Sequence, residues 1–136
     1  MTHDEYGKSI LLKAGNSFVK IYGPTLEVDY KHGRTARIDG TYKGIIAIEI
    51  ESRVPKQIRG ALIDLICHDY PKKLLVILPV HQPNPETTAN QCKYILEHFL
   101  PKDSFLVVVL KGYGNNPQFE HDVRVVKDAL HQLEAS

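Results

Sequence analysis

The chain has 136 residues, of which 43% are hydrophobic and 24% charged, and 17 Lys and Arg against 16 Asp and Glu give a formal net charge of +1. These ordinary globular values exclude disordered, collagen-like and coiled-coil proteins. The longest apolar runs, 74–78 and 105–110, are far shorter than the roughly 20 residues that cross a bilayer. The polar N-terminus carries no signal-peptide pattern. We therefore expect a cytoplasmic, intracellular protein with no membrane partner, folded as a single α/β domain over residues 1–136.

The first half of the chain combines one helical pattern with short β-rich segments and glycine turns. Apolar residues at helical spacing predict a helix over 3–14, which Gly15-Asn16 ends. Three strands joined by tight turns are then expected to form an antiparallel meander, preceded by a short extra strand. These four segments lie at 18–22, 26–30, 34–42 and 45–51.

The second half alternates amphipathic helices, all three with proline in the first turn, with continuously apolar strands. The helices are expected at 55–70, 84–99 and 116–133, and the strands at 73–79 and 104–110. The resulting order, α-β-β-β-α-β-α-β-α, predicts a three-layer α/β/α sandwich with a mixed central sheet. Cys67 and Cys92 both fall in helical apolar patterns, so we expect buried hydrophobic side chains and no disulfide.

Three carboxylates stand out at the predicted hairpin of 34–51. Glu49 and Glu51 are two residues apart in an apolar strand, so they point to the same face of the sheet. Two acids placed there repel each other and lose solvation, which calls for a cation beside them, either Lys or Arg or a metal ion. Asp39 lies opposite Glu49 only if the loop has an odd number of residues; a two-residue Lys43-Gly44 turn would place Asp39 on the other face. With that register, two adjacent strands offer the hard oxygen ligands that suit Mg²⁺, with Mn²⁺ as a substitute.

The pattern Ile38-Asp39, nine intervening residues and then Glu49-Ile-Glu51 before a helix resembles the PD-(D/E)XK nuclease superfamily over roughly residues 3–80. The resemblance implies a restriction-endonuclease-like αβββαβ core, here with a C-terminal αβα extension. It also implies a Mg²⁺-dependent endonuclease that hydrolyses DNA phosphodiester bonds with a metal-activated water. Asp39 and Glu49 match the acids that bind the catalytic metal in that superfamily. Glu51 stands where lysine is usual, as in certain restriction endonucleases, and Ser52-Arg53 is similar to archaeal Holliday-junction resolvases.

Further residues are candidates for the same chemistry. The resemblance implies an acid in the first helix as another metal ligand, which is Glu5 or Asp4. Lys56 could supply the charge of the missing lysine, and either Lys56 or Glu51 could position or deprotonate the attacking water. Basic residues that could contact a phosphate backbone are Arg34, Arg37, Arg53 and Arg59.

Other interpretations of the same residues stay open. Asp39, Glu49 and Glu51 could form a structural salt-bridge cluster with nearby arginines, and Asp29 is a rival for the role of the first acid. The segment 111–116 joins a strand to a helix, where α/β proteins bind phosphates, so a nucleotide-binding domain is a weaker option.

The replacement of lysine by Glu51 also leaves open a catalytically inactive nuclease-fold module that serves DNA binding or subunit assembly. Because 136 residues hold little beyond such a core, we expect cleavage of duplex DNA to require a homodimer or a partner subunit.

Overall fold

The computed structural model describes residues 1–53 and 55–136, which form a mixed α/β structure with a five-stranded sheet and four helices. The expectation of an α/β fold is thereby confirmed. The elements, in chain order, are α1 (His3–Gly15), β1 (Val19–Lys20), β2 (Glu27–Val28), β3 (Ala36–Arg37), β4 (Gly40–Tyr42), β5 (Ile46–Glu51), α2 (Pro55–Cys67), β6 (Lys72–Ile77), α3 (Pro85–Glu97), β7 (Phe105–Val109) and α4 (Phe119–Ala135).

The main sheet has the strand order β1-β4-β5-β6-β7. Its first three strands are antiparallel, and β5, β6 and β7 are parallel. The antiparallel part follows from the short turn between β4 and β5, and the parallel part from the crossover helices α2 and α3.

The expected three-stranded meander is wrong, because the predicted strand 34–42 is divided between two sheets. β2 and β3 form a separate two-stranded sheet, and β1 takes the place beside β4. The division falls between Ile38, whose N–H donates to Leu26, and Asp39, whose N–H donates to Ile48 of β5. Leu26, Val28 and Ile38 are all buried in the core beneath α2, so side-chain burial draws this segment away from the main sheet.

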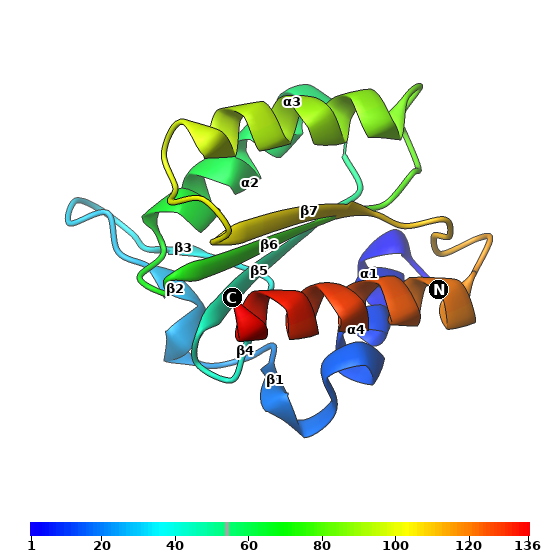
Figure 1. Ribbon diagram of the computed structural model, residues 1–136, viewed down its shortest axis with the longest axis horizontal. Coiled ribbons are helices and arrows are strands. Elements are labelled where there is room, and N and C mark those ends of the chain that lie inside the picture. The colour runs from blue at the N-terminus through cyan, green and yellow to red at the C-terminus, as the bar shows by residue number, and fades with distance from the viewer. Residues whose placement is uncertain (54) are drawn as a thin grey trace.

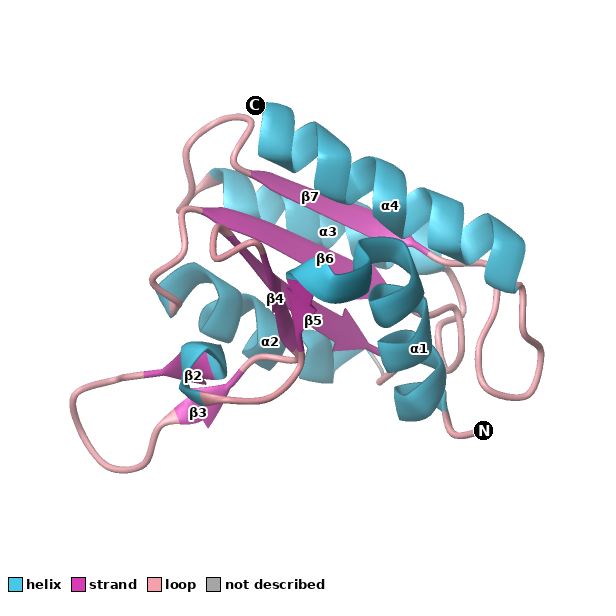
Figure 2. Cartoon of the chain, turned by 90° about the horizontal axis from the view of Figure 1, so that it is seen from below, coloured by secondary structure: helices cyan, strands magenta, loops and turns pink. Residues whose placement is uncertain are grey.

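Helices cover both faces of the main sheet (Figure 1): α2 and α3 lie on one face, and α1 and α4 lie on the other. The turned view in Figure 2 shows the small β2–β3 sheet projecting from one corner. Alternate side chains of the strands supply two separate cores, Ile48, Leu74 and Val76 toward α1 and α4, and Leu75 and Ile77 toward α2 and α3. Among the described residues, no helix combines the length and the apolarity needed to cross a membrane.

Two sequence-based expectations about the helices are corrected. The last helix begins at Phe119 rather than at Asn116, because Asn116 forms a backbone-paired turn with Tyr113. Cys67 is exposed at the end of α2, whereas Cys92 is buried as expected, and burial raises the pKa of the Cys92 thiol to about 11. Both thiols are free.

Asp122 ties the N-terminus of α4 to the rest of the molecule. Its fully buried carboxylate accepts hydrogen bonds from the Tyr6 hydroxyl at 2.6 Å and from the Lys111 and Gly112 N–H groups at 2.8 and 2.9 Å. His121 Nδ1 lies 2.8 Å from the same carboxylate. Burial alone would raise the pKa of Asp122, but these hydrogen bonds hold it below its ordinary value.

Asp122→Asn is expected to lower the free energy of unfolding by about 2–4 kcal/mol, because an amide NH₂ faces donors that need an acceptor. Urea denaturation followed by circular dichroism measures the effect. Asp128→Asn, an exposed position on the same helix, is the matched control and should change stability by less than about 0.5 kcal/mol. An equal, small effect of both substitutions would contradict this account.

Candidate active site

The register of the β4–β5 hairpin brings Asp39 and Glu49 together. Gly40 pairs with Ile48 and Tyr42 with Ile46, so three residues, 43–45, form the loop. Lys43 and Gly44 take positive φ values of 52° and 67° to close it. The odd-length loop that the sequence analysis required is therefore present, and Asp39 continues the register directly opposite Glu49.

The two acids exchange hydrogen bonds with each other's strand. The Asp39 N–H donates to Glu49 Oε1 at 2.9 Å, and the Ile50 N–H donates to Asp39 Oδ2 at 2.7 Å. The Glu49 side chain is almost completely buried, with 5% of its surface exposed. Burial and the adjacent charge of Asp39 raise the pKa of Glu49 to about 10, and burial also raises the pKa of Asp39. Two carboxyl groups this close either share a proton or share a cation.

Glu51 lies two residues further along the same face and is held by an arginine. Arg53 Nε donates to Glu51 Oε2 at 2.8 Å, and Arg53 Nη2 donates to the other oxygen. This ion pair matches part of the salt-bridge alternative left open by the sequence. Asp39 and Glu49 have no comparable cation among the described residues, because none of the ion pairs found there includes either of them.

These groups open into a cleft of about 290 Å³ at the carboxyl end of β5. Five carboxylates and two guanidinium groups line it, an excess of three formal negative charges. The charged lining residues are Asp4, Asp39, Glu49, Glu51, Asp64, Arg37 and Arg53. Such an imbalance in a partly closed space favours the binding of a cation.

Of the two acids proposed in the first helix, Asp4 lines the cleft and Glu5 does not. Glu5 instead completes a capping box: its N–H donates to the Thr2 hydroxyl, and its carboxylate accepts the Thr2 N–H, both at 3.0 Å. These hydrogen bonds lower the pKa of Glu5. Glu5 is therefore engaged at the helix terminus, and Asp4 is the acid of this pair that borders the cleft.

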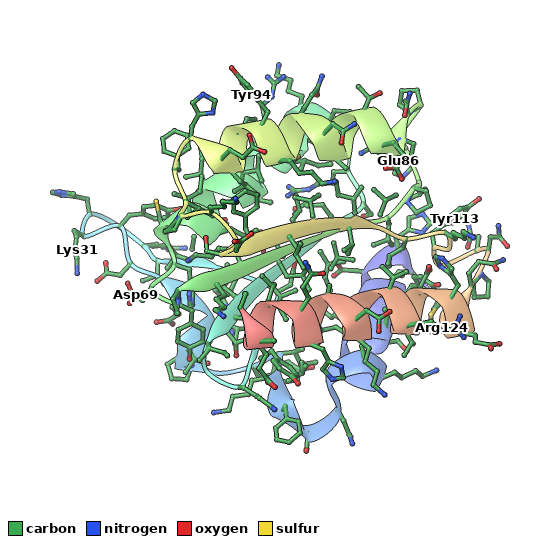
Figure 3. All side chains as sticks on the ribbon, in the orientation of Figure 1. Lys31, Asp69, Glu86, Tyr94, Tyr113 and Arg124 are labelled. Atoms are coloured by element: carbon green, nitrogen blue, oxygen red, sulfur yellow. The ribbon has the colours of Figure 1, made fainter. Side chains whose placement is uncertain are left out.

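Several basic candidates lie elsewhere. Lys56 and Arg59 are exposed on α2; Lys56 is not among the residues lining the cleft, and Arg59 lines a separate groove between α2 and α3. Arg34 belongs to the loop that also carries Lys31, which Figure 3 shows at the opposite end of the molecule from Tyr113. Arg37 and Arg53 are the two predicted DNA contacts that border the cleft.

Asp64 is a cleft residue that the sequence analysis missed. It comes from the middle of α2 and accepts a hydrogen bond from the Tyr30 hydroxyl at 2.5 Å. Together with burial, this bond raises the pKa of Tyr30. One feature of the sequence could have identified Asp64: it stands between Ile63 and Leu65 in an amphipathic helix, and an acid among apolar residues is unusual.

A second missed feature is a group of aromatic rings near the same end of the sheet. The ring centroids of His3 and His81 are 5.7 Å apart, and those of His3 and Tyr113 are 5.6 Å apart. His81 adopts a positive φ of 62°, and its neighbour Gln82 donates to the carbonyl of Arg53. The rings thus come from the start of α1 and from the segments that follow β6 and β7, and no sequence spacing reveals that these segments meet.

The rival sites receive no support from the geometry. Asp29 is exposed and forms an ion pair with Lys31 at 3.4 Å, so it does not replace Asp39. In the segment 111–116, the Gly112 N–H donates to Asp122 and the Gly114 N–H donates to His3. Because these donors already have partners in the protein, they are not available to cradle a phosphate.

The donor set fits a hard cation only in part. Among the described residues, no group of three or more His, Cys, Asp or Glu side chains is arranged to hold a metal ion. Asp39 and Glu49 nevertheless provide two buried carboxyl groups, and Mg²⁺ is commonly held by one or two carboxylates, with water molecules as its other ligands.

No protein-family model, curated protein or solved structure matches the chain.

The raised pKa of Glu49 makes the stability of the protein depend on pH. The native state holds this proton more tightly than the unfolded chain, where the pKa is 4.5, so its stabilising effect is complete below pH 4.5 and is lost as the pH rises toward about 10. Glu49→Gln should therefore flatten the pH dependence and raise the free energy of unfolding at about pH 8 by about 1–3 kcal/mol.

Urea denaturation at a series of pH values between about 5 and 9 tests this expectation. Glu86→Gln, at an exposed position in the first turn of α3, is the control and should leave the slope unchanged. A wild-type stability that does not vary with pH over this range would show that the Glu49 carboxyl is not forced to keep its proton.

Proposed function

We propose that this chain is a Mg²⁺-dependent endonuclease of the PD-(D/E)XK type that hydrolyses phosphodiester bonds in DNA. The observation that carries the proposal is the buried pair Asp39 and Glu49, brought side by side from adjacent strands at the base of an acidic cleft. Two like charges without a cation are costly there, and a divalent ion removes the cost.

The chain's own residues define how such a site would work. Asp39 and Glu49 would hold the cation, and backbone N–H groups from the opposite strand already fix the orientation of both carboxylates. A bound Mg²⁺ or Mn²⁺ supplies Lewis-acid stabilisation of charge on a phosphoryl oxygen and lowers the pKa of water. Arg53, oriented by Glu51 and half-exposed at the cleft, can donate to a phosphate oxygen.

The order of elements supports the same proposal. Helix α1, the strands up to β5, helix α2 and strand β6 follow the αβββαβ order of the restriction-endonuclease-like core, and β7 and α4 follow it. Helices on both faces of the mixed sheet favour the three-layer sandwich (Figure 1). Asp39 directly precedes β4 and Glu49 lies on β5, and the superfamily resemblance implies these positions for the two acids, which supports the proposal.

A second candidate is a catalytically inactive nuclease-fold module for DNA binding or subunit assembly. Glu51, at the third motif position, favours this candidate. Both of its carboxylate oxygens already accept hydrogen bonds from Arg53. No lysine stands among the described residues that line the cleft, so the positive charge usual in the superfamily comes only from arginine.

Purified protein incubated with branched, single-stranded and duplex DNA is expected to cleave at least one substrate in the presence of Mg²⁺ or Mn²⁺. Asp39→Ala and Glu49→Ala should each lower the rate by about 100-fold or more, because the cation contributes several kcal/mol to the transition state. Glu86→Ala is the control: it removes an exposed acid that does not line the cleft, and it should cleave at the wild-type rate.

Isothermal titration with Mn²⁺ separates the two candidates from a purely structural cluster. Mn²⁺ binding that is lost in Asp39→Ala, together with DNA binding but no cleavage, would favour the inactive module. Absence of both Mn²⁺ binding and cleavage would overturn the proposed enzyme.

A further inference from the structure

Strand β7 leaves one edge of the main sheet open. It is the last strand of the sheet, and its five residues, Phe105 to Val109, are all apolar. Four of them are partly exposed, whereas the side chains of the adjacent β6 from Lys73 to Ile77 are buried. The opposite edge, β1, has only two residues and ends on exposed Lys20. Short, charged edges resist pairing, whereas a longer apolar edge without charge or proline is a template for another strand.

The backbone groups on this edge can be assigned from the pairing with β6. Ser104 accepts a hydrogen bond from Lys73 N–H, and Leu110 N–H donates to Ile77, so even-numbered residues face β6 at both ends of the strand. In a parallel ladder the direction alternates at every residue. The N–H and C=O groups of Phe105, Val107 and Val109 therefore point away from β6, along the open edge.

We propose that a second copy of this chain pairs with β7 in antiparallel orientation, with the two-fold axis at Val107. This register sets Val107 against Val107 and Phe105 against Val109 of the second copy. Each odd-numbered residue then lies opposite an odd-numbered residue of the second copy, so all three outward N–H groups and all three outward C=O groups of each copy acquire partners. A shift of one residue would oppose odd to even residues and leave these groups unpaired.

The charges at the two ends of β7 agree with pairing to an identical chain. Exposed Asp103 precedes the strand and exposed Lys111 follows it. Asp103 has a positive φ of 65° and lies in the turn before the strand, so it does not continue the ladder itself. The antiparallel arrangement brings the end of β7 that carries Asp103 in one copy beside the end that carries Lys111 in the other, so opposite charges are neighbours at both ends. Parallel pairing of the two strands would instead place like charges together, so the charge pattern selects the antiparallel arrangement.

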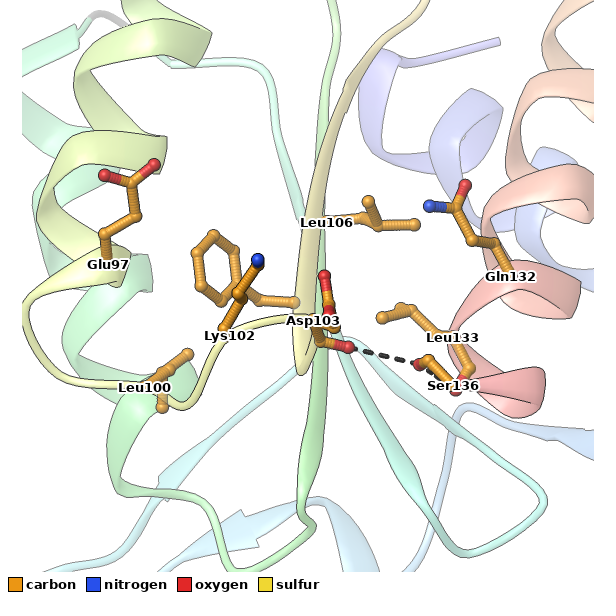
Figure 4. A pocket seen from close by; sticks show the side chains of 9 residues that line it. Glu97, Leu100, Lys102, Asp103, Leu106, Gln132, Leu133 and Ser136 are labelled. Carbon is orange, nitrogen blue, oxygen red and sulfur yellow. Dashed lines mark hydrogen bonds between the residues drawn. The ribbon is translucent and has the colours of Figure 1, made fainter.

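A groove beside the start of β7 would receive apolar side chains of the second copy. Figure 4 shows this groove of about 470 Å³, with Leu100, Leu106 and Leu133 among its lining residues. In the proposed register Leu106 lies opposite Val108 of the second copy, on the face that also carries Leu133. Closing the groove in this way would remove apolar surface from water.

This pairing does not depend on the proposed nuclease activity, and it constrains that activity. A two-fold axis perpendicular to the sheet forms a ten-stranded sheet and keeps each helical layer on its own face. Antiparallel strands also turn the carboxyl ends of β5 in the two copies to opposite ends of the assembly. The two acidic clefts would then bind separate DNA segments and would not cut one duplex at adjacent positions.

Sedimentation velocity over a range of concentrations tests the interface with a charge reversal and its rescue. Lys111→Glu is expected to raise the dimer dissociation constant by about tenfold or more, because each Asp103 then lies near a glutamate of the other copy. The double change Asp103→Lys with Lys111→Glu should restore the wild-type constant. Lys20→Glu, the same change of charge at the opposite sheet edge, should have no effect.

Amide hydrogen exchange measured by NMR supplies a second and independent readout. The N–H groups of Leu106, Val108 and Leu110, which face β6, should be protected at every concentration. Those of Phe105, Val107 and Val109 should become protected only where the dimer forms. A monomer at all concentrations up to about 1 mM, or a dimer in which the odd-numbered amides remain unprotected, would overturn the proposal.

Discussion

The central constraint in this molecule is the burial of two carboxyl groups, Asp39 and Glu49, in contact across neighbouring strands. Like charges in an apolar sheet are unstable unless backbone donors, a shared proton or a cation compensate them. The hairpin supplies two donors, the N–H groups of Asp39 and Ile50, but no basic side chain among the described residues pairs with either acid. The remaining compensation must come from outside the chain, as a proton or a metal ion, which is why we propose a functional site at this pair.

The acidic cleft and the apolar edge strand lie at different borders of the mixed sheet. Parallel strands β5, β6 and β7 end on the same side, so the segments that follow them gather near one end of the sheet. Acids from β5, α1 and α2 meet there, close to the rings of His3 and His81. The lateral edge at β7 carries no such groups and is uniformly apolar. Chemistry and assembly are therefore proposed at different borders of one sheet, without competition for surface.

Much of the fold could be predicted from periodicity alone. The helices and the strands of the second half follow strong apolar patterns, and the structure places them within a few residues of the predicted limits. The segment 34–42 was misjudged because its alternating pattern fits one long strand. Whether Ile38 continues the main sheet or packs under α2 depends on a core formed by distant residues, and such competition between long-range contacts is invisible in a local window.

By itself, the sequence determined the helices and the parallel strands to within a few residues, the acids of the hairpin and the condition under which they meet. Because side chains alternate between the two faces of a strand, Asp39 and Glu49 share a face only if the loop after Tyr42 has an odd number of residues. The loop has three residues. Tertiary structure alone decided which further groups join them. Asp4, not Glu5, lines the cleft, because Glu5 forms the capping box with Thr2. Asp64 lines it because α2 packs across the sheet. Such convergence depends on the packing of whole elements, which side-chain spacing along the chain does not encode.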